Sequence, residues 1–245
     1  ANLPPNSKAA ILAKLESEIA NFDKDQRLAA ITLVEGPQRI RGLAGSGKTI
    51  VLAMKAAHIH LHHPEAIILF TFWTKSLYDL AKQLITRFYR QFDDRDPDWT
   101  KLNILHAWGG KNIEGVYYNA CIDNGIIPLR FKQVPSTEKN AFGYVCQRLS
   151  GEKHVEPKYD YILIDEGQDF PIPFYQLCFK LTKGGAYDRN VIWAYDELQT
   201  ILDTDVQNVH ETFGHDSAGK PLMDLDRARK TLTEDLLPHD IVLHT

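Results

Sequence analysis

Short, continuous runs of apolar residues alternate along the chain with longer segments whose apolar positions recur at helical spacing. Such short runs are typical of strands buried on both faces of a parallel sheet. Helical spacing predicts amphipathic helices that cover the sheet, so the alternation favours an α/β fold. The expected strands span 37–41, 66–70, 102–105, 159–164, 190–195 and 241–245, and the expected helices span 8–21, 24–30, 50–63, 77–92, 141–149 and 173–183.

Two stretches depart from this alternation. Periodicity is weak over 111–158, which we interpret as a small insertion of unassigned topology, with one helix near its end. Residues 203–219 are polar and rich in turn-forming types, so we expect them to be exposed.

Residues 42–49 read Gly-Leu-Ala-Gly-Ser-Gly-Lys-Thr and fit the phosphate-binding pattern G-x-x-x-x-G-K-[ST] at every fixed position. The glycines let the backbone curl so that successive N–H groups point into one concavity. Lys48 adds a positive charge for the β- and γ-phosphates, and the Thr49 hydroxyl can ligate Mg²⁺. A strand before the loop and a helix after it argue against a chance glycine-rich turn. The predicted nucleotide-binding residues here are Gly42, Ala44, Gly45, Ser46, Gly47, Lys48 and Thr49.

Two adjacent acids, Asp165 and Glu166, follow the apolar run 159–164. Asp165 suits contact with Mg²⁺, and Glu166 suits the general base that activates water at a γ-phosphate. Adjacent carboxylates also occur in ordinary turns, but a phosphate-binding loop upstream in the same chain favours the catalytic interpretation. Gln199 follows the strand expected at 190–195 and can reach the γ-phosphate.

Gln26 lies shortly before the loop, and its amide can pair with the N6/N7 edge of adenine. A solvated glutamine on a first helical turn is the alternative. Phe72, Trp73 and Lys75 follow the strand expected at 66–70, at the edge where open α/β sheets bind ligands. The aromatic rings can stack on bases there, or they can simply pack beneath the next helix.

Composition narrows the partners and the compartment. The net charge of -4 offers no general attraction to nucleic acid, so any such binding must be local. The three cysteines lack metal-ligand spacing, which fits free buried thiols in a reducing, cytoplasmic compartment. We find no apolar run long enough for a membrane span and no signal peptide at the polar N-terminus, and we expect no membrane partner.

In order and spacing, these motifs resemble the N-terminal RecA-like motor domain of superfamily 1 DNA helicases of the UvrD/Rep/PcrA kind. Residues 22–26 resemble the adenine-reading Q motif, and residues 42–49 match motif I. Thr-Phe-Trp-Thr-Lys at 71–75 is similar to the T-F-T-N-K of motif Ia. His106 corresponds to the histidine of motif Ib.

Motifs II and III complete the resemblance. Residues 165–169, Asp-Glu-Gly-Gln-Asp, resemble D-E-x-Q-D, and residues 196–199, Asp-Glu-Leu-Gln, match D-x-x-Q. Tyr195 stands where the family usually has glycine before motif III. Trp73 and Thr74 replace the usual Thr and Asn of motif Ia, so its DNA contacts would differ from those of the family.

The resemblance implies a RecA-like P-loop NTPase over residues 1–245, with a largely parallel sheet flanked by helices and the small insertion at 111–158. ATP and Mg²⁺ are the implied cofactors. Thr49 and Asp165 would hold the metal ion, and Gln168 and Gln199 would sense the γ-phosphate. The implied catalytic residues are Glu166, Lys48 and Gln199.

The resemblance also implies partners. Motifs IV, V and VI, which lie on a second RecA-like domain and supply arginines to the γ-phosphate, are not found in this sequence. We therefore expect a second RecA-like domain in the same parent protein, and weak or no ATP hydrolysis by this chain alone. The other expected partner is single-stranded DNA, with RNA not excluded. The implied nucleic-acid-binding residues are Phe72, Trp73, Lys75 and His106.

The function predicted first is the ATP-binding domain of a helicase or translocase that couples ATP hydrolysis to movement along single-stranded DNA. Two other classes stay open. A small-molecule kinase would leave Gln168 and Gln199 without a role, and a signalling GTPase would need an N-K-x-D segment that we do not find. A non-catalytic domain that binds nucleotide and recruits partners is the third possibility.

Overall fold

A six-stranded parallel sheet forms the centre of the protein. The computed structural model describes residues 24–33, 35–185, 188–196, 208–225 and 239–243. The helix expected at 8–21 lies outside the described residues. The strands follow the order β3-β2-β4-β5-β1-β6. They are β1 (Gln38–Gly42), β2 (Ile68–Phe72), β3 (Leu102–His106), β4 (Tyr161–Ile164), β5 (Asn190–Asp196) and β6 (Asp240–Leu243).

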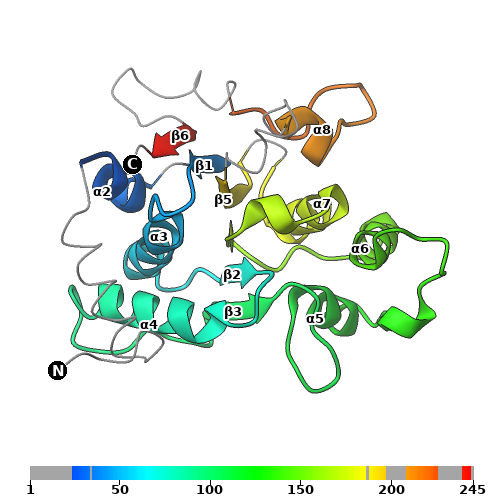
Figure 1. Ribbon diagram of the computed structural model, residues 1–245, viewed down its shortest axis with the longest axis horizontal. Helices are drawn as coiled ribbons and strands as arrows, with labels where there is room; N and C mark the ends of the chain where they lie inside the picture. The colour runs from blue at the N-terminus through cyan, green and yellow to red at the C-terminus, as the bar shows by residue number, and fades with distance from the viewer. Residues whose placement is uncertain (1–23, 34, 186–187, 197–207, 226–238, 244–245) are drawn as a thin grey trace.

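Helices cover both faces of the sheet, as Figure 1 shows. One face carries α2 (Lys24–Ile31), α3 (Lys48–His62) and α4 (Leu77–Tyr89). The other carries α5 (Val116–Asp123), α6 (Ala141–Gly151), α7 (Ile172–Leu181) and α8 (Val209–Phe213). Two short 3₁₀ helices, η1 (Phe131–Gln133) and η2 (Gly167–Asp169), lie in the connections. The fold is therefore the α/β, RecA-like P-loop arrangement expected from the sequence.

The sheet separates two hydrophobic cores because successive side chains of a strand point to opposite faces. Leu69 and Trp193 pack with α5, α6 and α7, whereas Phe70 and Ile192 pack with α2, α3 and α4. Strands buried on both faces read as continuous apolar runs, which explains the sequence pattern.

Three expectations need adjustment. Strand β2 begins and ends two residues later than predicted, so Phe72 belongs to the strand. The segment 111–158 supplies α5, η1 and α6, and the buried side chains of α5 and α6 share one core with α7. The expectation that 203–219 is exposed is wrong at α8, where Phe213 is buried against Tyr175 and Trp193 because its ring completes that core.

A charged cluster joins the edge strand β6 to β1. Asp240 accepts hydrogen bonds from Arg39 Nε at 3.0 Å and Nη2 at 2.8 Å, and from Arg41 Nε at 2.8 Å and Nη2 at 3.0 Å. Burial acts to raise the pKa of Asp240, but the two guanidinium groups outweigh it, and the pKa is lowered.

We expect Asp240→Ala to lower the free energy of unfolding by about 3 kcal/mol, because two largely buried arginines lose their partner. Urea denaturation measures the change. Asp93→Ala, which removes the partner of Arg95 in an exposed loop, serves as the control and should cost under about 1 kcal/mol. Equal losses in the two variants would contradict this view of the cluster.

All three cysteines are buried and free, as the sequence analysis expected. Within the described residues, no helix combines the length and apolar character that crossing a membrane requires.

Candidate nucleotide and strand site

The predicted phosphate-binding loop, residues 42–49, links β1 to α3. Gly42 ends β1, and a Cβ atom there would lie 2.5 Å from the Ser46 hydroxyl, so a larger residue would displace the loop. Gly45 and Gly47 have φ angles of 84° and 76°, in the left-handed region that favours glycine. Gly47 caps α3, so the N–H groups of its first turn face the loop. Ala44 is exposed beside them.

Lys48 lies over this loop. Its Nζ atom donates to the carbonyl oxygens of Gly42 at 2.8 Å and Leu43 at 2.7 Å. It also lies 3.8 Å from a carboxylate oxygen of Asp196, at the end of β5. The ammonium group is thus held at the mouth of the loop, where it can bind anionic groups.

Asp165 follows β4 and is buried, with 2% of its surface exposed. Burial raises its pKa to about 6, although the Thr49 hydroxyl and the Glu166 backbone N–H act to lower it. Its Oδ1 atom accepts the Glu166 N–H at 2.9 Å, but Oδ2 is buried without a hydrogen-bond partner among the described residues. A buried, unpaired carboxylate oxygen beside a threonine hydroxyl is a donor set that fits Mg²⁺.

Glu166 stands at a strained position. Its φ of 54° is the only positive φ of a non-glycine residue in the described ranges. Such backbone outliers are often found at functional sites. Its Oε2 atom accepts the Thr74 N–H at 3.3 Å, so the side chain points to the loop after β2. Sequence reasoning did not identify Thr74 as a partner of Glu166.

Gln168 connects two neighbouring strand ends, because its Oε1 atom accepts the Asp196 N–H at 3.2 Å. Asp196 therefore contacts both Gln168 and Lys48, a role that the sequence analysis did not assign. The available signal was its place directly after the strand expected at 190–195, at the start of the Asp-Glu-Leu-Gln motif. Gln199 lies outside the described residues, and its role stays a prediction.

Gln26 on α2 reaches the phosphate-binding loop. Its Nε2 atom donates to the Ser46 carbonyl at 2.9 Å. The structure thus places the glutamine beside the loop, and contact with adenine stays a prediction. Phe22, the first residue of the proposed Q motif, lies outside the described residues.

The residues after β2 divide into a buried part and an exposed part. Phe72 is 1% exposed and packs in the core with α3 and α4, so the prediction that its ring stacks on a base is wrong. Trp73 is 36% exposed and contacts Phe142 and Phe170. Lys75 is exposed at the same edge.

His106 joins two loops through its half-buried ring, and its contact with nucleic acid stays a prediction. Its Nδ1 atom accepts N–H groups of Trp108 at 3.2 Å and Gly109 at 3.4 Å. The ring also hydrogen-bonds the Trp73 backbone, while burial lowers the pKa of His106 and favours the neutral form. The histidine therefore positions both tryptophan-bearing loops.

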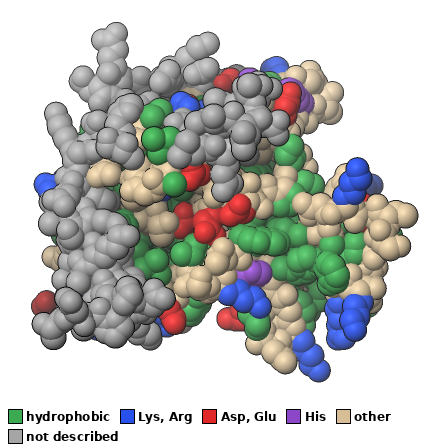
Figure 2. All heavy atoms as spheres, viewed as in Figure 1, with side chains coloured by type: hydrophobic (Ala, Val, Ile, Leu, Met, Phe, Trp, Pro, Cys, Tyr) green, Lys and Arg blue, Asp and Glu red, His purple; other side chains and the backbone are tan. Residues whose placement is uncertain are grey.

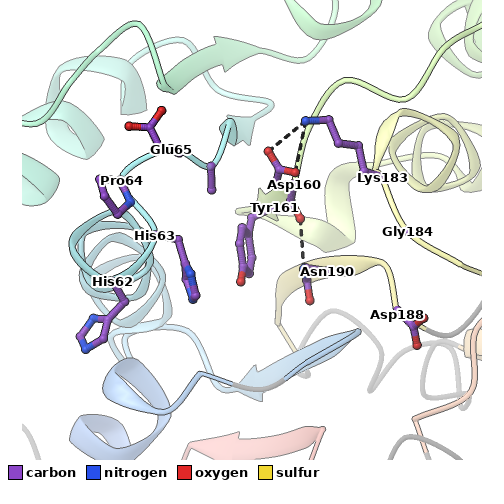
Figure 3. A pocket seen from close by; sticks show the side chains of 11 residues that line it. His62, His63, Pro64, Glu65, Asp160, Tyr161, Lys183, Gly184, Asp188 and Asn190 are labelled. Carbon is purple, nitrogen blue, oxygen red and sulfur yellow. Dashed lines mark hydrogen bonds and ion pairs between the residues drawn. The ribbon is translucent and has the colours of Figure 1, made fainter.

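A separate cavity of about 730 Å³ lies at the opposite edge of the sheet, where β4 and β5 begin. Figure 3 shows the His63 and Tyr161 rings stacked side by side in its lining, and Lys183 paired with Asp160. None of the predicted site residues lines this cavity. The predicted chemistry instead gathers where β2, β4, β5 and β1 end, as neighbours in the sheet.

Comparison with known proteins finds similarity to helicases. The family model described as the UvrD/REP helicase N-terminal domain matches residues 23–141. The chain is 38% identical over 65 residues to "Putative ATP-dependent DNA helicase YjcD" of Bacillus subtilis (strain 168). The aligned segment covers 25% of this chain and 9% of that protein. The matched residues contain the loop at 42–49 and the Trp73 edge, so this part of the chain is similar to the N-terminal domain of UvrD/REP helicases.

Proposed function

We propose that this chain is the ATP-binding motor domain of a helicase or translocase that couples ATP hydrolysis to movement along single-stranded DNA. The observation that carries the proposal is the meeting of Lys48, Asp165 and Glu166 at one edge of the sheet, beside the exposed Trp73. The region spans 1–245 as one RecA-like domain. The proposed partner domain is a second RecA-like domain in the same parent protein.

In this proposal the loop binds the phosphates of ATP. Backbone N–H groups from Gly42 to Thr49 and the Lys48 ammonium group face the phosphate oxygens. Thr49 and Asp165 would hold Mg²⁺, and the orphaned Oδ2 atom of Asp165 supports this assignment. When bound, this ion neutralises charge on the β- and γ-phosphates. Gln26 would recognise adenine from α2.

Glu166 would accept a proton from the attacking water. Glu166 lies in the strained turn after β4, and its carboxylate accepts a hydrogen bond from the Thr74 N–H. A base fixed by its backbone at this point needs little reorganisation to orient water. Lys48 stabilises charge at the transferring phosphoryl group, and Gln199 stays the proposed γ-phosphate sensor.

Contacts among the strand ends support coupling between nucleotide and nucleic acid. Glu166 bonds the loop that carries Trp73, and Gln168 bonds Asp196, which also contacts Lys48. A change at the γ-phosphate can therefore reach the Trp73 loop through one hydrogen bond. In the proposal, Trp73 and Lys75 contact the single strand. His106 and Phe72 support this edge from within.

Two further roles are kept as alternatives, a small-molecule kinase and a non-catalytic, nucleotide-dependent partner-binding domain. ATP turnover measured with and without single-stranded DNA distinguishes them. Stimulation by DNA supports the motor, transfer of phosphate to a metabolite supports the kinase, and binding without turnover supports the third role. We propose that catalytic arginines come from the second domain, so this chain alone should hydrolyse ATP slowly.

We expect Lys48→Ala to weaken binding of ATP–Mg²⁺ about 10-fold or more, because a charge-assisted contact to phosphate is lost. Isothermal titration calorimetry measures the affinity, and a thermal melt checks the fold. Lys153→Ala, at an exposed lysine beyond α6, is the control and should bind as the unmodified chain does. Equal affinity in all three proteins would reject the loop as the phosphate site.

A further inference from the structure

A groove next to the Trp73 edge is lined by aromatic and basic side chains that the proposed function does not use. Its volume is about 630 Å³, and its side-chain walls include Trp108, Lys111, Tyr118, Arg130 and Phe131. We call it the aromatic–basic groove. It lies between the loop that follows β3, helix α5 and the short helix η1.

The groove is joined to the Trp73 edge through Phe142, a core ring of 2% exposure that packs against both Trp73 and Trp108. The ring centroids of Trp73 and Phe142 are 5.2 Å apart, and those of Phe142 and Trp108 are 5.2 Å apart. Phe131 follows at 6.2 Å from Trp108. Phe131 is 71% exposed, so most of its ring does not pack in the core and is accessible to a ligand.

The walls of the groove are firmly held. Gly109 and Gly115 pack back to back, so that a Cβ atom on Gly115 would lie 2.3 Å from the Gly109 backbone. Gly110 exchanges backbone hydrogen bonds with Ile113 at 2.7 and 3.3 Å, which closes the turn that carries Lys111. On the opposite wall, the Leu129 N–H donates to the Tyr117 hydroxyl at 2.9 Å. A rigid groove presents its rings at little entropic cost.

The charge of the groove fits a polyanion. Lys111 and Arg130 are exposed, neither forms an ion pair with a described residue, and no acidic residue lines the cavity. Figure 2 shows the same division on a larger scale, with acidic side chains gathered at the centre of the face and a hydrophobic area beside them that is bordered by Lys and Arg.

We propose that the aromatic–basic groove binds the continuation of a single-stranded nucleic acid that first contacts Trp73. This inference rests on the proposed function and extends its substrate path. Phe131 stacks on a base, and Lys111 and Arg130 contact phosphates on either side of it. Exposed rings interleaved with cations suit unpaired bases, whereas a duplex offers its bases only at its ends. An apolar protein partner would leave both cations without partners.

The test is binding of fluorescently labelled dT16 and rU16 to the whole chain, followed by anisotropy over a series of salt concentrations and without nucleotide. We expect Phe131→Ala to weaken binding about 5-fold or more, the scale of one lost base–aromatic stack. Phe131→Tyr, which keeps an aromatic ring at this position, should bind as tightly as the unmodified chain. We expect the double variant Lys111→Ala/Arg130→Ala to lower the slope of log Kd against log salt by about 1.4, from two phosphate contacts.

The matched controls lie elsewhere on the surface. Phe92 is also 71% exposed, and Lys101 lies beside the opposite end of β3, so alanine variants of both should bind as the unmodified chain does. The inference is overturned if the Phe131 and double variants bind normally, if duplex competes as well as single strand, or if the chain binds neither oligonucleotide. Calorimetry with ATP is read separately, so these outcomes leave the nucleotide assignment standing. The two oligonucleotides report whether the groove prefers the DNA or the RNA strand.

Discussion

Replacing Glu166 with glutamine is expected to slow ATP hydrolysis by about 10²-fold or more, the usual scale for loss of a general base, while ATP binding is retained. Glutamine keeps the shape of the side chain, and its amide oxygen can still accept the Thr74 N–H that Glu166 Oε2 accepts at 3.3 Å. The proton acceptor alone is removed. Single-turnover hydrolysis, with protein in excess over labelled ATP, measures the chemical step even where the chain is slow.

The control for this variant is Glu138→Gln, at an exposed glutamate in the connection before α6. It should hydrolyse ATP at the rate of the unmodified chain. A Glu166→Gln protein with normal turnover would show that Glu166 serves the Thr74 loop and not the water. Loss of ATP binding in that variant would instead indicate that Glu166 holds the loop in shape.

Replacing Asp165 with asparagine is expected to stabilise the protein above pH 6 in the absence of nucleotide. Burial raises the pKa of Asp165 to about 6, so the folded state binds a proton more tightly than the unfolded state. Stability contributed by Asp165 is therefore present at low pH and falls as the pH rises from about 4 to about 6. The loss is about 3 kcal/mol, from roughly two pKa units at 1.36 kcal/mol each.

Urea denaturation between pH 4 and pH 8 tests this expectation. The difference in unfolding free energy between Asp165→Asn and the unmodified chain should grow from about pH 4 to about pH 6. Above pH 6 it should stay constant. Added Mg²⁺ and ATP should stabilise the unmodified chain more than the variant, because asparagine is the weaker ligand. An asparagine variant that is less stable at pH 8, by an amount independent of pH, would contradict the buried-carboxylate account.

The sequence by itself determined the class of fold and the main parts of the candidate site. Strands buried on both faces read as apolar runs, so the central strands β2, β4 and β5 were visible without coordinates. The loop at 42–49 was equally visible, because phosphate binding demands glycines, a lysine and a hydroxyl at fixed spacing. Asp165 and Glu166 followed from their position after a buried strand. Each of these features depends on residues that are close together in the sequence, so each can be recognised from the sequence alone.

Only the tertiary structure decided which side chains are buried, paired or strained. Phe72 and Trp73 are adjacent aromatic residues, but β2 ends two residues later than the sequence predicted. Phe72 is therefore in the strand and buried in the core, whereas Trp73 follows the strand and is exposed. Lys55 lies on α3 like any helical lysine, but it is fully buried and donates to the Thr32 carbonyl at 2.6 Å. The contacts of Glu166 with Thr74 and of Gln168 with Asp196 join residues 92 and 28 positions apart. Such contacts depend on strand order, which periodicity does not encode, because one pattern of runs is compatible with many orders of parallel strands.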